Sequence, residues 1–102
     1  MKIVINACYG GFSVSKAVYD ELGFEWVGFG YPSNEDFGIR SNNIYAFRSN
    51  ERLIHAIEKV GLKKSSGSCA DLKIIDIPNG IDFDIHSYDG VESVHEAHRF
   101  WD

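Results

Sequence analysis

The sequence predicts an α+β fold on three observations. Residues 3–5 form a short apolar run of the kind found in buried strands, and residues 81–88 alternate apolar with polar side chains, as a half-buried strand does. Between them, two segments carry apolar residues at helical spacing, and a glycine follows each segment. We expect the order β-α-β-α-β-β-β, with two helices packed on one face of a small mixed or antiparallel sheet.

The first strand and the first helix are predicted near the N-terminus. Lys2–Asn6 contains the apolar run and is expected to be a strand. Ser13 or Ser15 is expected to cap a helix that continues to about Leu22, because a serine hydroxyl accepts a hydrogen bond from the first helical turn. Gly23 follows at the position where glycine commonly ends a helix.

The middle of the chain is expected to contain a loop, a strand and the second helix. Residues 24–31 are rich in aromatic residues and glycine and are hard to assign, whereas residues 32–43 have the composition of a loop. Residues 44–47 are expected to be the second strand. Asn50 is then expected to cap a helix over Glu51–Val60, which a glycine ends.

The last third of the chain is expected to consist of a loop and three strands. Residues 62–70 carry lysines, serines and glycine and predict a solvent-exposed loop. Residues 72–77 and 81–88 predict two strands separated by a Pro-Asn-Gly sequence. Asp-Gly at residues 89–90 is a strong hairpin signal, so residues 91–94 are expected to return antiparallel.

Length, composition and charge limit the function. The chain has 102 residues, 44% hydrophobic and 25% charged, which predicts one globular domain over residues 1–102. A formal net charge of −5 argues against DNA or RNA polymers as partners but allows a small anionic ligand. No segment reads as a signal peptide or membrane span, and the two cysteines lack zinc-site spacing. We therefore expect a cytoplasmic protein that binds no membrane and needs no cofactor.

The most informative stretch is Asn-Ala-Cys-Tyr-Gly-Gly-Phe-Ser at residues 6–13. Gly10 and Gly11 allow unusual backbone conformations and the close approach of another group, and Ser13 stands where a helix is expected to begin. A strand, a glycine turn and a helix start together favour anion binding, because the first helical N–H groups are unpaired. We expect Gly10, Gly11 and the N–H groups near Ser13 to hold a phosphate.

Two arginines are the candidates to neutralise that phosphate. Arg48 lies between a predicted strand and a predicted helix cap, and Arg99 lies near the C-terminus. Arginine binds phosphate through two parallel, charge-assisted hydrogen bonds. For Arg48 an ordinary salt bridge, with Asp89 or Glu92 as partner, is an equally good interpretation.

Aromatic side chains are the candidates to stack on a base. Stacking contributes roughly 1–3 kcal/mol per base. Most of the rings must nevertheless form the core of so small a domain. The rings expected to meet a ligand are Tyr9, Phe12 and Tyr88.

Cysteine and histidine offer two chemical alternatives. Cys8 lies just before the predicted helix, where a thiol is acidified, but a nucleophile needs a base, and cysteine at a strand end is more often a small buried hydrophobe. His95 and His98 are three residues apart, whereas the histidines of the zinc-protease motif are four apart on one helical face. We therefore expect no metal site.

Several motifs together resemble one protein family. They are Val-Ile-Asn-Ala-Cys-Tyr-Gly-Gly-Phe-Ser-Val-Ser at 4–15, Arg-Ser-Asn at 48–50, Leu-Lys-Ile-Ile-Asp-Ile-Pro at 72–78, Tyr-Asp-Gly-Val-Glu at 88–92 and Glu-Ala-His-Arg-Phe-Trp at 96–101. The chain thereby resembles a family of small, mostly uncharacterised proteins of phages, prophages and bacteria. In size and context it is similar to phage proteins that sequester the nucleotide signals of bacterial immune systems, which implies a site of action in the host cytoplasm.

The residues and the resemblance together predict a non-enzymatic, homo-oligomeric protein that captures a phosphate-bearing small molecule, such as a cyclic nucleotide or an ADP-ribose-type signal. The expected ligand-binding residues are Tyr9, Gly10, Gly11, Phe12, Ser13, Arg48, Tyr88, His98 and Arg99. Two alternatives stay open. One is a small hydrolase or phosphodiesterase that uses Cys8, Glu92 and His98. The other is an inhibitor of a host factor that binds through an aromatic surface at residues 26–31.

Overall fold

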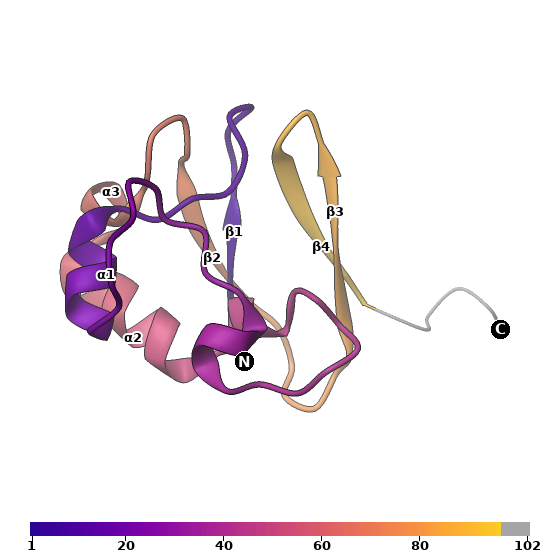
Figure 1. Cartoon of the computed structure of the whole chain (residues 1–102). Helices are drawn as coiled ribbons and strands as arrows, with labels where there is room; N and C mark the ends of the chain where they lie inside the picture. Colours follow the sequence, from indigo (N-terminus) through magenta and orange to yellow (C-terminus); the bar gives the residue numbers. More distant parts are fainter. Residues whose placement is uncertain (97–102) are drawn as a thin grey trace, which may run out of the picture.

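The computed structural model, which describes residues 1–96, has helices and strands and confirms the α+β class (Figure 1). Four strands form two antiparallel pairs: β1 (Lys2–Asn6) with β2 (Leu72–Asp76), and β3 (Phe83–Tyr88) with β4 (Val91–Glu96). The helices lie on one side of the β1–β2 pair, and the β3–β4 hairpin lies on the other side (Figure 1). The sheet component is therefore antiparallel but divided into two parts.

Two α-helices, α1 (Lys16–Leu22) and α2 (Glu51–Val60), begin and end close to the predicted positions. The short α3 (Leu62–Ser65) lies in the stretch predicted to be a loop. Ser15 is the N-cap residue of α1, but the predicted side-chain cap is wrong, because its hydroxyl donates to Lys64 O instead. The Asn50 side chain accepts a hydrogen bond from the Arg52 N–H and caps α2 as predicted. Gly23 ends α1 in the left-handed conformation that glycine adopts without strain.

The predicted strand at residues 44–47 is wrong, because this part of the chain forms a turn and a 3₁₀-helix, η2 (Ala46–Ser49). Two asparagine side chains stabilise the turn. Asn43 Oδ1 accepts the Tyr45 N–H at 2.9 Å, and Asn34 Oδ1 accepts the Phe47 N–H at 2.8 Å. Asn34 belongs to a second 3₁₀-helix, η1 (Asn34–Phe37), in the predicted loop. Phe47 is therefore buried by a turn rather than by a sheet, and Ile44 is left 69% exposed.

Strand β1 separates two hydrophobic clusters. Val4 packs with the helices in the larger cluster, which also contains Val18, Phe47 and Leu53. Ile3 and Ile5 point to the other face and pack against Phe83 and Ile85 of β3. Because side chains alternate across a strand, a run that is apolar throughout is buried on both faces, which explains the Ile-Val-Ile sequence of β1.

The β3–β4 hairpin forms at the predicted turn. Tyr88 lies opposite Val91, with Asp89 and Gly90 between them. Both turn residues have positive φ, 51° for Asp89 and 91° for Gly90, which is the requirement of the tight hairpin turn that Asp-Gly favours. The turn of the hairpin is thus specified by its local sequence.

Candidate functional site

A crevice of about 440 Å³ opens where three chain segments meet: residues 10–16, residues 26–30 and residues 66–68. We call it the Lys16 crevice. The first segment contains three of the predicted ligand-binding residues, Gly10, Phe12 and Ser13. The second segment belongs to the aromatic stretch that the sequence left unassigned.

Backbone contacts hold the three segments together. The Val14 N–H donates to Gly30 O at 2.8 Å, and the Gly67 N–H donates to Ser13 O at 3.1 Å. A Cβ on Gly30 would lie 2.1 Å from the Val14 carbonyl oxygen, and a Cβ on Gly67 would lie 2.2 Å from Ser13 Oγ. Only glycine allows these approaches, so the shape of the crevice is built into the sequence.

The wall of the crevice has an unusual charge for this chain. One basic residue, Lys16, lines the crevice, and no Asp or Glu does. Four other grooves on residues 1–96 each include at least one Asp or Glu side chain. The Lys16 ammonium is exposed and lies 3.0 Å from a carboxylate oxygen of Asp20, one turn along α1. An exposed pair of this kind is weak, so Lys16 can turn to another anion at little cost.

Most donors predicted to cradle a phosphate already have partners in the protein. The Val14 N–H is bonded to Gly30 O, and the Ser15 N–H donates to Ser65 O at 2.8 Å. The Ser13 hydroxyl lies 3.3 Å from Ser68 O, and the Ser15 hydroxyl donates to Lys64 O at 2.6 Å. These groups stabilise the walls, which leaves Lys16 and the aromatic rings of residues 26–30 to meet a ligand.

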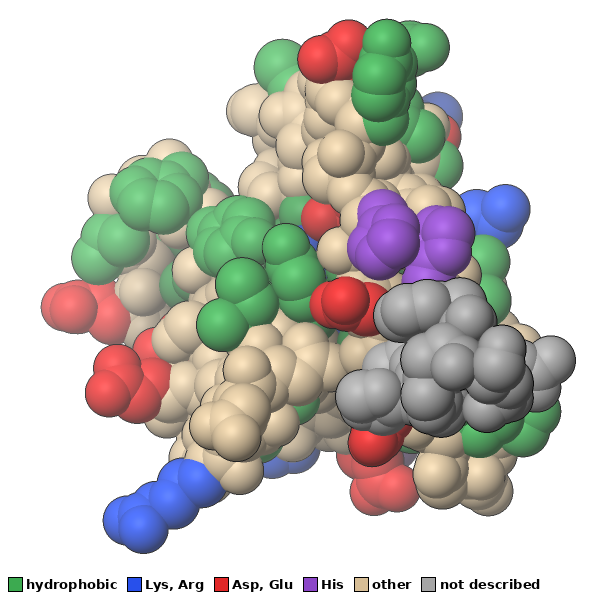
Figure 2. Space-filling model, turned by 90° about the vertical axis from the view of Figure 1, so that its right-hand side faces the viewer, with side chains coloured by type: hydrophobic (Ala, Val, Ile, Leu, Met, Phe, Trp, Pro, Cys, Tyr) green, Lys and Arg blue, Asp and Glu red, His purple; other side chains and the backbone are tan. Residues whose placement is uncertain are grey.

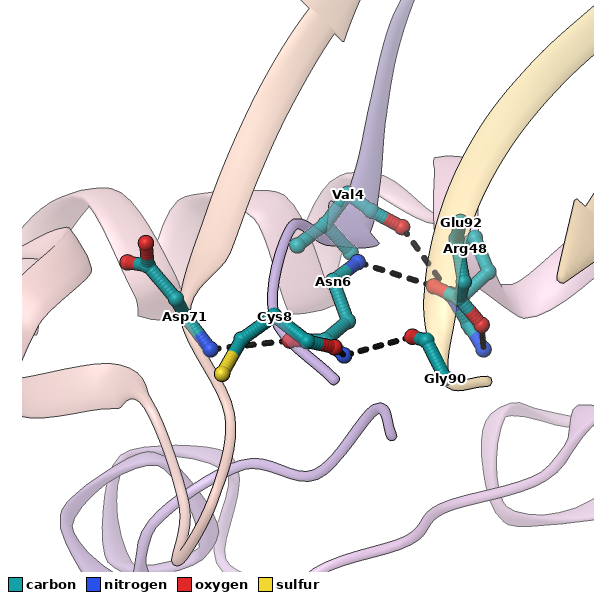
Figure 3. Close-up of polar contacts among 7 residues, drawn as sticks. All are labelled: Val4, Asn6, Cys8, Arg48, Asp71, Gly90 and Glu92. Carbon is teal, nitrogen blue, oxygen red and sulfur yellow. Dashed lines mark hydrogen bonds and ion pairs between the residues drawn. The ribbon is translucent and has the colours of Figure 1, made fainter. Parts of the chain in front are cut away.

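Arg48 forms a buried ion pair with Glu92 (Figure 3). Arg48 Nη1 lies 2.7 Å from Glu92 Oε1, and Nη2 lies 2.9 Å from Oε2, in the two-bond geometry that arginine and carboxylate favour. The exposed fraction is 0% for the Arg48 side chain and 7% for the Glu92 side chain. The salt-bridge interpretation, with Glu92 as partner, is confirmed, and both charges lie inside the protein.

The Arg48–Glu92 ion pair connects the β1–β2 sheet to the β3–β4 hairpin, which have no backbone hydrogen-bond ladder between them. Glu92 Oε1 also accepts the backbone N–H of Asn6 at 2.8 Å, and Arg48 Nη1 donates to Val4 O at 3.3 Å. Both backbone groups belong to β1 and would otherwise be unpaired, which is costly for buried groups. The guanidinium also lies 3.5 Å from the centroid of the Phe12 ring, so Phe12 stacks on Arg48.

Asn6, which the sequence analysis did not single out, connects three chain segments (Figure 3). Its Nδ2 donates to Cys8 O at 2.6 Å and to Gly90 O at 2.7 Å, and its Oδ1 accepts the Asp71 N–H at 2.8 Å. The side chain is completely buried. The sequence signal for this role is an asparagine that directly follows an apolar run and precedes a turn. At such a position the side chain can be buried, and a buried amide must be hydrogen-bonded.

Gly10 and Gly11 are close to other parts of the chain. A Cβ on Gly10 would lie 1.8 Å from the backbone oxygen of Cys69, and a Cβ on Gly90 would lie 2.5 Å from the Gly11 nitrogen. Gly11 also has a φ of 90°, in the region that favours glycine. The double glycine thus lets the N-terminal loop pack against its neighbours, which explains the motif without a ligand.

The other predicted ligand-binding residues lie apart from the crevice. Tyr9 and Tyr88 are 73% and 77% exposed and lie on the loop after β1 and at the end of β3. Gly90, two residues after Tyr88, touches the Tyr9 backbone, so the two rings belong to one end of the molecule. His98 and Arg99 lie outside the described residues.

The hydrolase alternative depends on Cys8, Glu92 and His98. Cys8 is half-buried and free, but Glu92 is committed to Arg48 and Asn6. Elsewhere, His86 and His95 stack on the β3–β4 hairpin with ring centroids 3.9 Å apart. Figure 2 shows histidine side chains on the face that it displays. Residues 1–96 contain no group of three His, Cys, Asp or Glu side chains able to hold a metal ion.

Comparison with known proteins identifies no relative. The chain matches no protein-family model, no curated protein and no solved structure. Within residues 1–96, no helix has the length and hydropathy needed to cross a membrane. Function must therefore be argued from the geometry and charge of the molecule alone.

Proposed function

We propose that this protein binds and sequesters a phosphate-bearing small molecule, such as a cyclic nucleotide or an ADP-ribose-type signal, in the Lys16 crevice. The observation that carries the proposal is the lining of the crevice, which includes Lys16 and no Asp or Glu although the chain has a net charge of −5. Charge of one sign within a crevice raises the local concentration of ligands of the opposite sign. Lys63 and Lys64 are exposed on α3, which directly precedes the third wall segment in the sequence.

The aromatic side chains of the second wall segment suit the rest of such a ligand. Trp26 is half-buried and Phe29 is 66% exposed, so each ring offers a face or an edge to a base. A stacked base contributes roughly 1–3 kcal/mol. A charge-assisted hydrogen bond from Lys16 to phosphate contributes about 1.5–3 kcal/mol. Capture without turnover is the simplest outcome, because Glu92, the carboxylate of the hydrolase alternative, is held in an ion pair.

A thermal-shift panel tests the proposal. The protein is heated with cyclic dinucleotides, cyclic trinucleotides, ADP-ribose and cyclic ADP-ribose isomers, each at saturating concentration. A ligand present at a thousand times its dissociation constant stabilises the folded state by about 4 kcal/mol, so a tight ligand gives a clear rise in Tm. The ligand is then released by heat and identified by mass spectrometry; intact ligand supports sequestration, and a cleaved product supports the hydrolase alternative.

Two lysine variants connect the binding to the crevice. Lys16→Ala removes the cation of the wall, whereas Lys59→Ala removes an equally exposed, ion-paired lysine of α2 that lies outside the crevice. Loss of one charge-assisted bond predicts about tenfold or more weaker binding for Lys16→Ala. Equal affinity for the two variants, or a panel without any rise in Tm, would contradict the proposal.

A further inference from the structure

A second cleft, of about 540 Å³, lies against the same aromatic stretch. Four rings line it: Tyr19, Phe24, Phe29 and Tyr31. Tyr19 and Phe24 meet edge to face with centroids 5.8 Å apart. Phe29 also contributes to the Lys16 crevice, so one exposed ring lies between the two hollows. We call this second hollow the aromatic cleft.

The charge of the aromatic cleft is opposite to that of the Lys16 crevice. Glu25 and Asp36 line the cleft, and no Lys, Arg or His residue does. Asp36 Oδ2 accepts hydrogen bonds from the Ser33 N–H at 2.8 Å and the Ser33 hydroxyl at 3.3 Å, which fixes the orientation of the carboxylate. Burial raises the pKa of Tyr19, and the nearby charge of Asp36 raises it further, so the Tyr19 hydroxyl stays protonated beside the carboxylate.

Exposed apolar side chains flank the cleft. Val27 and Phe29 are each 66% exposed, and Tyr31 is 49% exposed. Single exposed apolar residues are ordinary, but these three all line the same cleft and give it an apolar margin. Such a margin suits contact with the residues on either side of an inserted side chain.

Aromatic faces combined with carboxylates are the recognition chemistry of an organic cation. A guanidinium fits best, because it is planar, stacks on rings and donates to two carboxylates at once. The chain already uses this contact elsewhere: Arg52 Cζ lies 5.6 Å from the centroid of the Phe24 ring and 5.9 Å from that of Phe37. Phe24 therefore has a guanidinium beside it within the fold and also contributes to the wall of the cleft.

We propose that the aromatic cleft binds an arginine side chain presented by a segment of a partner protein. Glu25 and Asp36 pair with the charge of the guanidinium. Val27 and Tyr31 contact the partner residues next to the arginine. This site shares the Phe29 ring with the Lys16 crevice but is lined by acidic rather than basic residues. Its two carboxylates repel phosphate, so the phosphate of a ligand in the Lys16 crevice does not enter it.

The test uses a short synthetic peptide as the probe, Ac-Ala-Leu-Arg-Leu-Ala-NH₂, titrated into the whole ¹⁵N-labelled protein. A second peptide carries citrulline, which has the shape of arginine without its charge, and the third probe is N-acetylarginine amide. We expect the arginine peptide to shift the amide signals of residues that line only the aromatic cleft, namely Tyr19, Glu25, Tyr31 and Asp36. We also expect it to bind at least about threefold more tightly than either other probe. Equal binding of the citrulline peptide would overturn the cation site, and equal binding of N-acetylarginine amide would overturn the partner segment.

A matched pair of variants locates the site. Glu25→Gln removes a carboxylate of the cleft, and Glu35→Gln removes a neighbouring exposed carboxylate of η1 that lies outside it. Both substitutions are on the surface and keep the size of the side chain. We expect Glu25→Gln to weaken the arginine peptide by about threefold or more and Glu35→Gln to leave it unchanged. The same loss in both variants would show general electrostatic attraction and overturn the assignment.

Discussion

The Arg48–Glu92 pair predicts the largest effect of a single substitution on stability. Glu92→Gln removes one charge, keeps the size of the side chain and leaves the Arg48 guanidinium buried without a counter-ion. Removal of one partner of a buried pair costs about 3–5 kcal/mol, because the remaining charge stays desolvated. Arg48 Nε already lacks a hydrogen-bond partner, so the guanidinium has little alternative compensation in the interior. Against a total of about 5–15 kcal/mol for a domain of this size, this is a large fraction.

Urea unfolding followed by tryptophan fluorescence measures this loss. Trp26 packs edge to face on Tyr19, with centroids 5.2 Å apart, so its emission reports the core. With a slope of about 1–3 kcal/mol per molar urea, the midpoint is expected to fall by about 1 M or more. Asp20→Asn is the control, because its exposed pair with Lys16 is expected to contribute under about 0.5 kcal/mol. The reasoning would be refuted if the free energy of unfolding of Glu92→Gln lay within about 1 kcal/mol of the wild-type value, which corresponds to a shift of the midpoint by about 0.3–1 M urea.

Three further predictions concern the same fold. Asn6→Ala leaves buried backbone groups of three segments without a partner and is expected to lower the free energy of unfolding by about 1–3 kcal/mol, measured by the same urea titration. Gly10→Ala places a methyl group against the Cys69 backbone and is expected to cost about 1–3 kcal/mol, whereas a neutral result would show that the loop moves easily. The raised pKa of Tyr19 means that the folded state keeps a proton that the unfolded chain loses. The stabilising effect of this proton is therefore complete below about pH 10 and is lost as the pH rises through the pKa of the folded state. Above about pH 10, the free energy of unfolding should decline less steeply in Tyr19→Phe than in the wild type.

The elements that the sequence predicted well are those with local signals. The cap at Asn50 and the glycine after Leu22 set the ends of α2 and α1, and the Asp-Gly turn set the hairpin. These signals act within a few residues, so they can be recognised without the rest of the molecule.

The homo-oligomer stays a prediction, which light scattering on the purified protein would test.

The misassigned stretch at residues 44–47 shows where local signals fail. Phe47 does pack into the core, but Ile44 is 69% exposed. The backbone turns because Asn34 and Asn43 bind N–H groups of the stretch from outside it. The same limit applies to Arg48. The sequence allowed a salt bridge with Glu92, but only the structure shows that both side chains are buried and that they replace a ladder between β1 and β4.

The candidate site was predicted only in part. Gly10, Phe12 and Ser13 do line the Lys16 crevice, although the glycine packs against Cys69, the ring stacks on Arg48 and the Ser13 hydroxyl is bonded to the wall. Lys16 was missed because a single lysine at a helix start is common. Trp26 and Phe29 were missed because an aromatic stretch without periodicity does not reveal which rings are exposed.

The most direct test of the proposed function is chemical-shift mapping of the ¹⁵N-labelled protein with ADP-ribose, which carries both phosphates and a base. We expect dose-dependent shifts in residues 10–16, 26–30 and 66–68, and a strong reduction of these shifts in Lys16→Ala. Shifts confined to another groove, or shifts of the crevice residues that Lys16→Ala does not weaken, would contradict the assignment of the phosphate site.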